Sequence, residues 1–329
     1  MTNNSSEPLV GIALAAYKPN IDYFVSQLNS IVNQTYANWF CRIGFDSPLA
    51  ETLDDPKLAI FKQDPRFRFF QNDHQLGATK NFEAAARVCL QEQPDFIAFS
   101  DQDDVWHANK IELQVAELKH RPSLSLVHCD MWILMKTPNG YVKLDETAWI
   151  AERRGVHNVK PLDFMIRNVA AGAGMLLDAK LVKQYGDIPD DCFGHDHWFA
   201  MAAAFNGGVY GMPAPLYDYR IHGANIAGLS RYSSFFGSSA TSKKFGTFKK
   251  CIYAYNSSAA RYSSAAKDFD TNTVQWLTAK TKIDLGTSYL LKAIADYAKD
   301  PALARACLAR AVGKCLSLIF FRYKSYSAT

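Results

Sequence analysis

Short apolar runs alternate with segments of helical periodicity in the N-terminal part of the chain. Four runs have the length and composition of strands buried on both faces: 8–17, 39–45, 67–70 and 95–100. Three segments carry apolar residues at helical spacing: 21–32, 79–91 and 107–120. We expect Thr79 to cap the second of these helices. The alternation predicts an α/β fold, with a mainly parallel sheet flanked by helices.

The later part of the chain follows a different pattern. An apolar strand is predicted at 123–134, and "TPNG" at 137–140 carries a hairpin turn signal. Three further elements are expected: a strand at 168–178, a helix at 195–205 and a strand at 215–223. Beyond residue 230 the sequence becomes rich in Ser, Tyr and Lys and then helical. We therefore expect an α/β domain over 1–228 and a basic helical C-terminal extension over 229–329.

The formal net charge of +4 is unevenly distributed along the chain. Residues 1–218 hold 19 Lys and Arg against 27 Asp and Glu, whereas residues 219–329 hold 17 against 5. The basic part is either a solvated helical region or a surface that meets an anion, such as a diphosphate or a lipid head group. Its basic residues form no nucleic-acid motif, so we do not expect nucleic acid as a partner.

Cysteines and hydropathy bear on the cellular location. Seven widely scattered cysteines without a C-x-x-C pair favour a reducing compartment over a disulfide framework or a zinc site. The polar stretch from Met1 to Pro8 has no signal-peptide pattern, and no segment approaches the roughly 18–20 apolar residues of a membrane-spanning helix. We expect a cytoplasmic protein.

Polar side chains follow three of the predicted strands. Tyr17, Asp46 and Asp101 each stand where an apolar run ends. Ligands of parallel α/β sheets bind beyond the carboxyl ends of the strands. The sequence therefore predicts that three separate segments meet at one edge of the sheet.

Three aspartates crowd into the segment "FSDQDDVW" at 99–106. Asp101, Asp103 and Asp104 would form an ordinary solvated turn, except that Phe99 and Trp106 enclose them. Like charges in a partly enclosed site need a cation, or they raise each other's pKa. Mg²⁺ binds one or two carboxylates and completes its shell with phosphate oxygens. The segment thus indicates a divalent metal, Mn²⁺ or Mg²⁺, that carries a diphosphate.

Ordered motifs resemble glycosyltransferase family two, which has the GT-A fold. They are "VGIALAAYKPN" (10–20), "LNSIVNQTYANW" (28–39), "FDS" (45–47), "NDHQLGATKNF" (72–82) and "FSDQDDVWHANKIE" (99–112). Two later motifs, "GHDHW" (194–198) and "PLYDYRIHGANIAG" (215–228), resemble the rhamnosyltransferase branch. The resemblance implies a catalytic domain over 1–228, with a nucleotide-binding half of about 1–105 and an acceptor half of about 106–228.

The resemblance implies roles in nucleotide binding. Tyr17 would line the base beside the Ala15 and Ala16 backbone, and Asp46 would accept a hydrogen bond from the pyrimidine. Gly77 and Lys80 would lie along the nucleotide, with Lys80 near phosphate. The family usually has a D-D-G-S pattern after its second strand, whereas this chain has Phe45, Asp46, Ser47 and Pro48. The departure lies at the position that would recognise the base.

Further roles concern the metal and the reaction. Asp101 would face the ribose or a metal-bound water, Asp103 would hold the metal, and Asp104 would support the metal or the donor sugar. Asp196 would be the catalytic base. Arg220 and His222 would meet the leaving diphosphate, His222 as a metal ligand.

Asp196 also has features that the sequence alone reveals. It opens a predicted helix, whose macrodipole favours a carboxylate at that end. The flanking His195 and His197 would keep it ionised whenever they carry charge. Without the resemblance, an N-terminal capping aspartate would be the simpler interpretation.

The C-terminal segment predicts a basic amphipathic helix. Six apolar residues form one stripe: Leu308, Val312, Cys315, Leu316, Ile319 and Phe320. The stripe either packs on the catalytic domain or lies on an anionic membrane surface. Many members of the family glycosylate lipid-linked acceptors, which favours peripheral association with the inner face of the cell membrane.

These observations predict an inverting, metal-dependent glycosyltransferase. The leading donor is dTDP-rhamnose, with a UDP-hexose as the alternative. The acceptor is expected to be a surface polysaccharide, lipopolysaccharide or lipid-linked glycan. A sugar nucleotidyltransferase is disfavoured because "LAAYKPN" lacks the Gly-rich loop of that class. A non-catalytic polysaccharide-assembly scaffold with the same fold is the alternative of another class.

Overall fold

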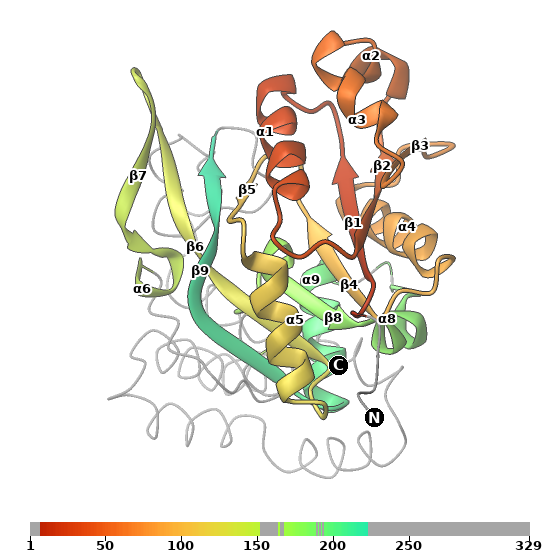
Figure 1. The fold of residues 1–329 in the computed structure, drawn as a ribbon, viewed down its shortest axis with the longest axis vertical. Helices are drawn as coiled ribbons and strands as arrows, with labels where there is room; N and C mark the ends of the chain where they lie inside the picture. Colours follow the sequence, from red (N-terminus) through yellow and green to blue (C-terminus); the bar gives the residue numbers. More distant parts are fainter. Residues whose placement is uncertain are drawn as a thin grey trace, which may run out of the picture.

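The computed structural model describes residues 7–151, 164, 168–188, 190, 192 and 194–222 (Figure 1). The elements of the first part alternate regularly: β1 (Val10–Ala16), α1 (Ile21–Val32), β2 (Trp39–Phe45), α2 (Leu49–Leu53), the 3₁₀ turn η1 (Pro56–Leu58), α3 (Ala59–Gln63), β3 (Phe67–Gln71), α4 (Ala78–Leu90) and β4 (Phe96–Ser100). The predicted extension over 229–329, with its amphipathic helix, lies outside the described residues.

The second part contains longer strands and one hairpin. Its elements are β5 (Val105–Trp106), α5 (Lys110–His120), β6 (Leu126–Thr137), β7 (Gly140–Thr147), α6 (Ala148–Ala151), the 3₁₀ turn η2 (Gly172–Gly174), β8 (Met175–Asp178), α8 (Ala179–Tyr185), α9 (His195–Phe205) and β9 (Val209–Ile221). The predicted turn at "TPNG" is confirmed, since Thr137 pairs with Gly140 in the β6–β7 hairpin.

One mixed sheet runs through the described part in the order β3-β2-β1-β4-β8-β6-β9-β5, with β7 added to β6. The strands β3, β2, β1 and β4 are parallel. The direction then changes, because β8 is antiparallel to both β4 and β6. The predicted α/β class with a sheet flanked by helices is confirmed, and the parallel part is its first half.

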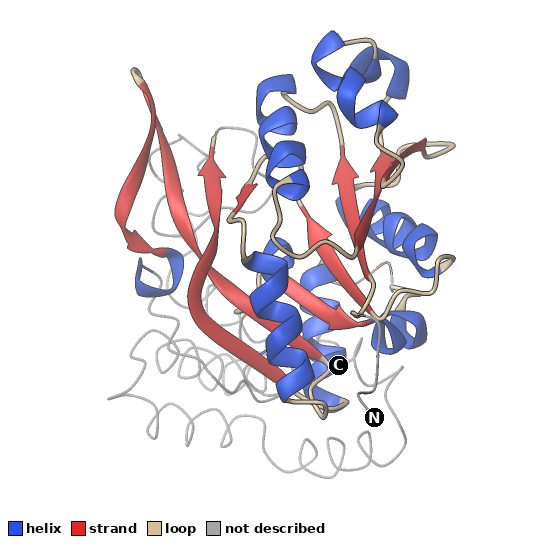
Figure 2. Cartoon of the chain, in the orientation of Figure 1, coloured by secondary structure: helices blue, strands red, loops and turns tan. Residues whose placement is uncertain are grey.

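Helices cover both faces of the sheet (Figures 1 and 2). Alternate residues of β1 point to opposite faces, so Ile12 and Leu14 join a core with α1 and α5, whereas Ala13 joins a core with α4 and α9. The near-continuous apolar run of β1 arises from this double burial. Within the described residues, no helix is long and apolar enough to cross a membrane.

The structure differs from several of the predicted elements. Thr79 does not cap α4, because the helix begins at Ala78 and Gly77 is its N-cap residue. The strand predicted at 168–178 is shorter, since η2 occupies Gly172–Gly174 and β8 begins at Met175. Helices α2 and α3 were not predicted, and their five-residue length leaves little room for a periodic pattern.

Candidate active site

The carboxyl ends of β1, β2 and β4 meet at one edge of the sheet, as predicted. The Asp46 amide donates to the Ala16 carbonyl oxygen at 2.8 Å, which ties the end of β2 to that of β1. Gln102 ties the aspartate segment to the end of β1. Its side chain accepts from the Tyr17 amide at 2.8 Å and donates to the Tyr17 carbonyl oxygen at 3.2 Å. The Tyr17 side chain is 41% exposed beside this junction.

Asp46 organises the loop that precedes α4. One carboxylate oxygen accepts from the Leu76 amide at 2.7 Å and from the Asn72 side chain at 3.1 Å. The other accepts from the Gly77 amide at 2.7 Å. Gly77 has a φ of +82°, a conformation that costs little only for glycine. The carboxylate therefore holds a sharp turn next to the end of β1.

Two backbone positions predicted to line the base belong to the same corner. Ala15 and Ala16 close β1 and pair with Gly44 and Phe45 of β2. The Ala16 carbonyl also accepts from the Asn81 side chain at 3.3 Å, which connects this corner to α4.

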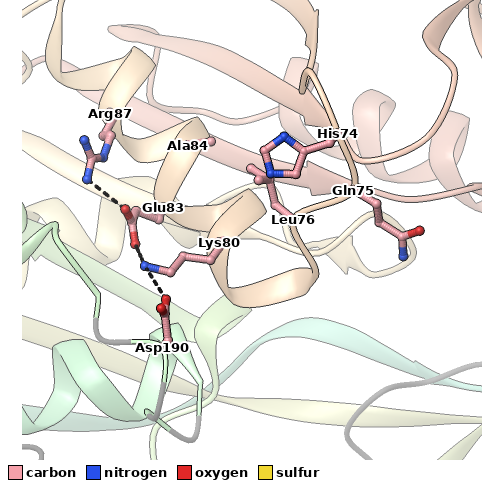
Figure 3. A pocket seen from close by; sticks show the side chains of 8 residues that line it. All are labelled: His74, Gln75, Leu76, Lys80, Glu83, Ala84, Arg87 and Asp190. Carbon is pink, nitrogen blue, oxygen red and sulfur yellow. Dashed lines mark hydrogen bonds and ion pairs between the residues drawn. The ribbon is translucent and has the colours of Figure 1, made fainter.

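Lys80 lines a pocket of about 400 Å³ beside α4, together with mostly polar and charged residues (Figure 3). Its ammonium donates to Glu83 at 3.0 Å and to the Ile188 carbonyl, and lies 3.3 Å from the Asp190 carboxylate. Burial alone would lower the pKa of Lys80, but the bonds to Glu83 and Asp190 outweigh it and raise the pKa. Within the described residues, the ion pairs of Lys80 are with these two acids and not with Asp101, Asp103 or Asp104.

The three crowded aspartates differ in their surroundings. Burial, then the charges of Asp103 and Asp196, raises the pKa of Asp101 to about 7. Asp104 is completely buried, and neither carboxylate oxygen has a hydrogen-bond partner in the part of the chain that the structure describes. Burial, followed by the charges of Asp101 and Asp103, holds the pKa of Asp104 well above its usual range.

The end of β9 brings Arg220 and His222 to Asp103. The His222 Nε2 atom lies 2.7 Å from a carboxylate oxygen of Asp103, and Arg220 Nη1 donates to the Asp103 carbonyl oxygen at 2.7 Å. The short strand β5, just after the aspartates, makes this possible, because it pairs with β9 at Asp218 and Tyr217. The predicted association of Asp103, Arg220 and His222 is thus present.

The side chains here suit a divalent cation. Asp103 and His222 approach each other closely enough to share an ion, and Asp104 is a buried carboxylate without a hydrogen-bonding partner among the described residues. No group of three or more His, Cys, Asp or Glu in the described ranges forms a metal cage. Two protein ligands are enough for a divalent ion that completes its shell with water and substrate phosphates. The imidazole of His222 suits Mn²⁺ better than Mg²⁺.

Asp196 stands in the first turn of α9, as predicted. One carboxylate oxygen accepts from the Asn168 side chain at 2.7 Å, and the other accepts from the His197 amide at 2.7 Å. Its charge contributes to the raised pKa of Asp101, so the two carboxylates lie close enough for their charges to interact. The helix macrodipole favours the ionised form of Asp196.

The expectation that charged histidines keep Asp196 ionised is wrong for His195. Its ring stacks on Phe82, with the ring centres 3.8 Å apart, and meets Phe99 edge to face. This burial lowers the pKa of His195 to about 3, so the ring is neutral at physiological pH. His197 is buried, with Nε2 2.8 Å from the Phe164 carbonyl oxygen.

Sequence reasoning did not identify several residues that shape the site. Gln102 joins β1 to the aspartate segment, Asn72 supports Asp46, and Asn168 holds Asp196. Gln102 and Asn72 lie inside recognised motifs, so their place in those motifs was the signal that could have identified them. Asn168 is distant from Asp196 in the sequence, and no local pattern connects the two.

The fold is that of GT-A glycosyltransferases. The model of Glycosyl transferase family 2 matches residues 15–182, which is half of the chain, and the chain belongs to this family. The match includes Tyr17, Asp46 and the three crowded aspartates.

Curated relatives resemble only part of the chain. Over 110 residues it is 31% identical to the Escherichia coli UDP-Glc:alpha-D-GlcNAc-diphosphoundecaprenol beta-1,3-glucosyltransferase WfgD, covering 33% of this chain and 40% of that protein. It is 23% identical over 142 residues to the uncharacterized glycosyltransferase MJ1057 of Methanocaldococcus jannaschii, covering 43% of this chain and 47% of the relative. The matches thus span less than half of each relative.

A solved structure shows the same fold. Residues 1–349 of S. aureus TarS, in complex with UDP-GlcNAc, match with a TM-score of 0.52 at 14% identity. The match covers 93% of this chain and 89% of that one. The rhamnosyltransferase branch finds no support in these relatives, because the similar E. coli protein is a glucosyltransferase.

Proposed function

We propose that this chain transfers a sugar from a nucleotide diphosphate donor to an acceptor hydroxyl, with inversion at the anomeric carbon and with a divalent metal. One observation supports this proposal more directly than the others. Asp103, Arg220 and His222 gather at the carboxyl edge of the sheet, and Asp196 faces the same site from α9. A charge-neutralising group and a base are the two kinds of help that this transfer needs.

The donor nucleotide would bind at the corner formed by Tyr17 and Asp46. The Tyr17 ring would lie against the base, next to the Ala15 and Ala16 backbone. Asp46 uses three acceptor positions for its own loop, and a carboxylate has about four, so one further bond to the base is compatible with this geometry. Gly77 would allow the loop to approach the nucleotide closely.

The diphosphate would lie across the aspartate segment. Asp103 and His222 would hold the metal, which neutralises developing charge on the leaving group, and Arg220 would add a second positive charge. Asp101 would bind the ribose or a metal water, and Asp104 would support the metal or the donor sugar. Lys80 would reach phosphate only by leaving Glu83 and Asp190.

Asp196 would act as the base. Its carboxylate takes the proton of the acceptor hydroxyl, the hydroxyl oxygen forms a bond to the anomeric carbon, and the bond from that carbon to the diphosphate oxygen breaks. The hydrogen bonds from Asn168 and from the His197 amide would fix the orientation of the carboxylate. In-line attack gives inversion.

Two donors are consistent with the observations. The motifs "GHDHW" and "PLYDYRIHGANIAG" favour dTDP-rhamnose, whereas the similarity to WfgD favours a UDP-hexose and a lipid-linked glycan acceptor. Polysaccharide or lipopolysaccharide synthesis at the inner face of the cell membrane fits either donor. We also propose that residues 1–228 are the catalytic domain and that 229–329 contact an anionic membrane or pack on that domain.

A thermal-shift panel of nucleotide sugars, with and without Mn²⁺, tests this function. Ligand stabilisation follows mass action, so the donor should raise the unfolding midpoint only with the metal and more than its analogues do. The absence of any Mn²⁺-dependent stabilisation or donor turnover would favour the non-catalytic scaffold instead.

A further inference from the structure

Arg220 packs against two tyrosines that no motif singles out. Its guanidinium carbon lies 4.4 Å from the ring centre of Tyr23 and 5.2 Å from that of Tyr141. Tyr23 belongs to the first turn of α1, and Tyr141 is the second residue of β7, next to the turn of the β6–β7 hairpin. The same guanidinium donates to the Asp103 carbonyl at 2.7 Å. Three separate elements therefore converge on one cation next to the predicted metal ligand.

The two tyrosines also hold each other. The Tyr141 hydroxyl donates to the Tyr23 hydroxyl at 2.9 Å, and the rings meet edge to face with centres 5.7 Å apart. Burial, together with this hydrogen bond, raises the pKa of Tyr141, so its phenol keeps the proton that it donates. The centre of the Tyr23 ring also lies 5.7 Å from the centre of the His222 ring. The pair thus borders both basic residues of the site.

Packing of this kind fixes an arginine without using its hydrogen-bonding edges. Aromatic rings contact the faces of a guanidinium, whereas phosphate oxygens bind the N–H groups at its edges. Arg220 is only 8% exposed, a setting in which cation–π attraction is stronger than in water. An arginine that is ordered before the ligand arrives loses less side-chain entropy on binding.

We propose that Tyr23 and Tyr141 are positioning residues that hold the Arg220 guanidinium beside Asp103, where it meets the diphosphate of the donor. The β6–β7 hairpin thereby becomes part of the donor site, although it is distant in sequence from the aspartates. The diphosphate part of this inference rests on the proposed function; the packing of Arg220 does not.

The packing is tested without any ligand, by labelling arginines of the full chain with phenylglyoxal and following Arg220 by mass spectrometry. Tyr23→Leu and Tyr141→Leu should speed labelling of Arg220 several-fold. Val142→Ala is the matched control, because Val142 is the next residue and is 52% exposed. Tyr23→Phe removes only the hydrogen bond between the two hydroxyls, so it should increase the labelling rate of Arg220 by less. This variant replaces the leucine variants if they do not fold. Unchanged labelling in folded variants would overturn the inference.

The phosphate role is tested by calorimetric titration with UDP or dTDP in the presence of Mn²⁺. Tyr141→Leu should weaken binding by about fivefold in the wild-type background, and by less than about twofold when combined with Arg220→Ala. Equal losses in both backgrounds would mean that Tyr141 acts independently of Arg220, which contradicts the inference. Absence of Mn²⁺-dependent nucleotide binding by wild type would overturn the proposed function and the phosphate role, but not the packing measured by labelling.

Discussion

Two buried aspartates at the same edge of the sheet have opposite surroundings. Asp46, after β2, is 7% exposed, and its carboxylate accepts three hydrogen bonds from the loop before α4. Asp104, after β4, is fully buried and has no hydrogen-bond partner among the described residues. Asp196, on α9, is intermediate, since Asn168 and the His197 amide each donate to it.

The difference separates residues that build the site from residues that need a ligand. A buried carboxylate is costly unless donors or a cation compensate its charge. Two of the donors to Asp46 are backbone amides, so this residue completes a structural loop. The Asp104 carboxylate lacks such donors within the described residues, and the nearby charges of Asp101 and Asp103 raise its pKa, so a divalent cation would supply the missing compensation.

The largest expected effect concerns Asp196. Asp196→Asn keeps the size of the side chain and one of its two acceptor oxygens but removes its ability to take a proton. Sugar transfer should fall by about 10³-fold, while the affinity for UDP or dTDP with Mn²⁺ stays within about twofold of wild type. Single-turnover transfer and calorimetric titration measure the two quantities. Wild-type transfer by Asp196→Asn would refute its assignment as the base.

The comparison of Asp46 with Asp104 predicts two different responses to the same substitution. Asp46→Asn replaces a charged acceptor of two backbone amides, so the free energy of unfolding should fall by about 2 kcal/mol. Asp104→Asn loses no hydrogen bond within the described residues and should change it by less than about 1 kcal/mol. In contrast, Asp104→Asn should weaken Mn²⁺-dependent nucleotide binding.

Urea unfolding without metal, followed by titration with Mn²⁺ and UDP or dTDP, measures both responses. Equal loss of stability in the two variants would show that the charge of Asp104 is compensated as fully as that of Asp46, which contradicts the comparison.

Near neutral pH the smallest effect concerns His195, which contacts Phe82 and Phe99, and it grows only as the pH falls. Its folded pKa of about 3 is below the unfolded value of about 6.5, so the unfolded chain binds the extra proton between these pH values. The free energy of unfolding should therefore fall as pH drops from about 6.5 toward 3, by at most about 1.4 kcal/mol per pH unit for this group. His195→Phe should have a shallower acid dependence. Identical slopes for both proteins would contradict a neutral, buried His195.

The first half of the fold could be predicted in detail because its signals are local. The boundaries predicted for 39–45 coincide with β2, since a strand buried on both faces is an unbroken apolar run. Strand β9 was only partly predicted, because it runs over Val209–Ile221 with polar and aromatic residues mixed along it. The short helices α2 and α3 carry too few residues for periodicity.

The residues of the candidate site also divide into those with a local sequence signal and those that meet only through long-range contacts. Strand ends indicated Tyr17, Asp46 and Asp101, and the crowding of carboxylates added Asp103 and Asp104. The resemblance to the family indicated Asp196, Arg220 and His222. The contacts of Lys80 with Glu83 and Asp190 were not predictable, because Asp190 lies far along the chain and no pattern relates it to Lys80. Tyr23 and Tyr141 are also distant in sequence, and their contact arises only in the folded chain. Long-range contacts of single side chains leave no trace in periodicity or composition.

The central claim is that the edge holding Asp103, Arg220 and His222 binds a nucleoside diphosphate through a divalent metal. Calorimetric titration of the full chain with UDP and with dTDP, with and without Mn²⁺, tests it most directly. We predict binding of one nucleotide that requires Mn²⁺ and that Asp103→Ala weakens about 100-fold or more, without a lower unfolding midpoint. Equal affinity with and without Mn²⁺, or wild-type affinity in Asp103→Ala, would contradict the account.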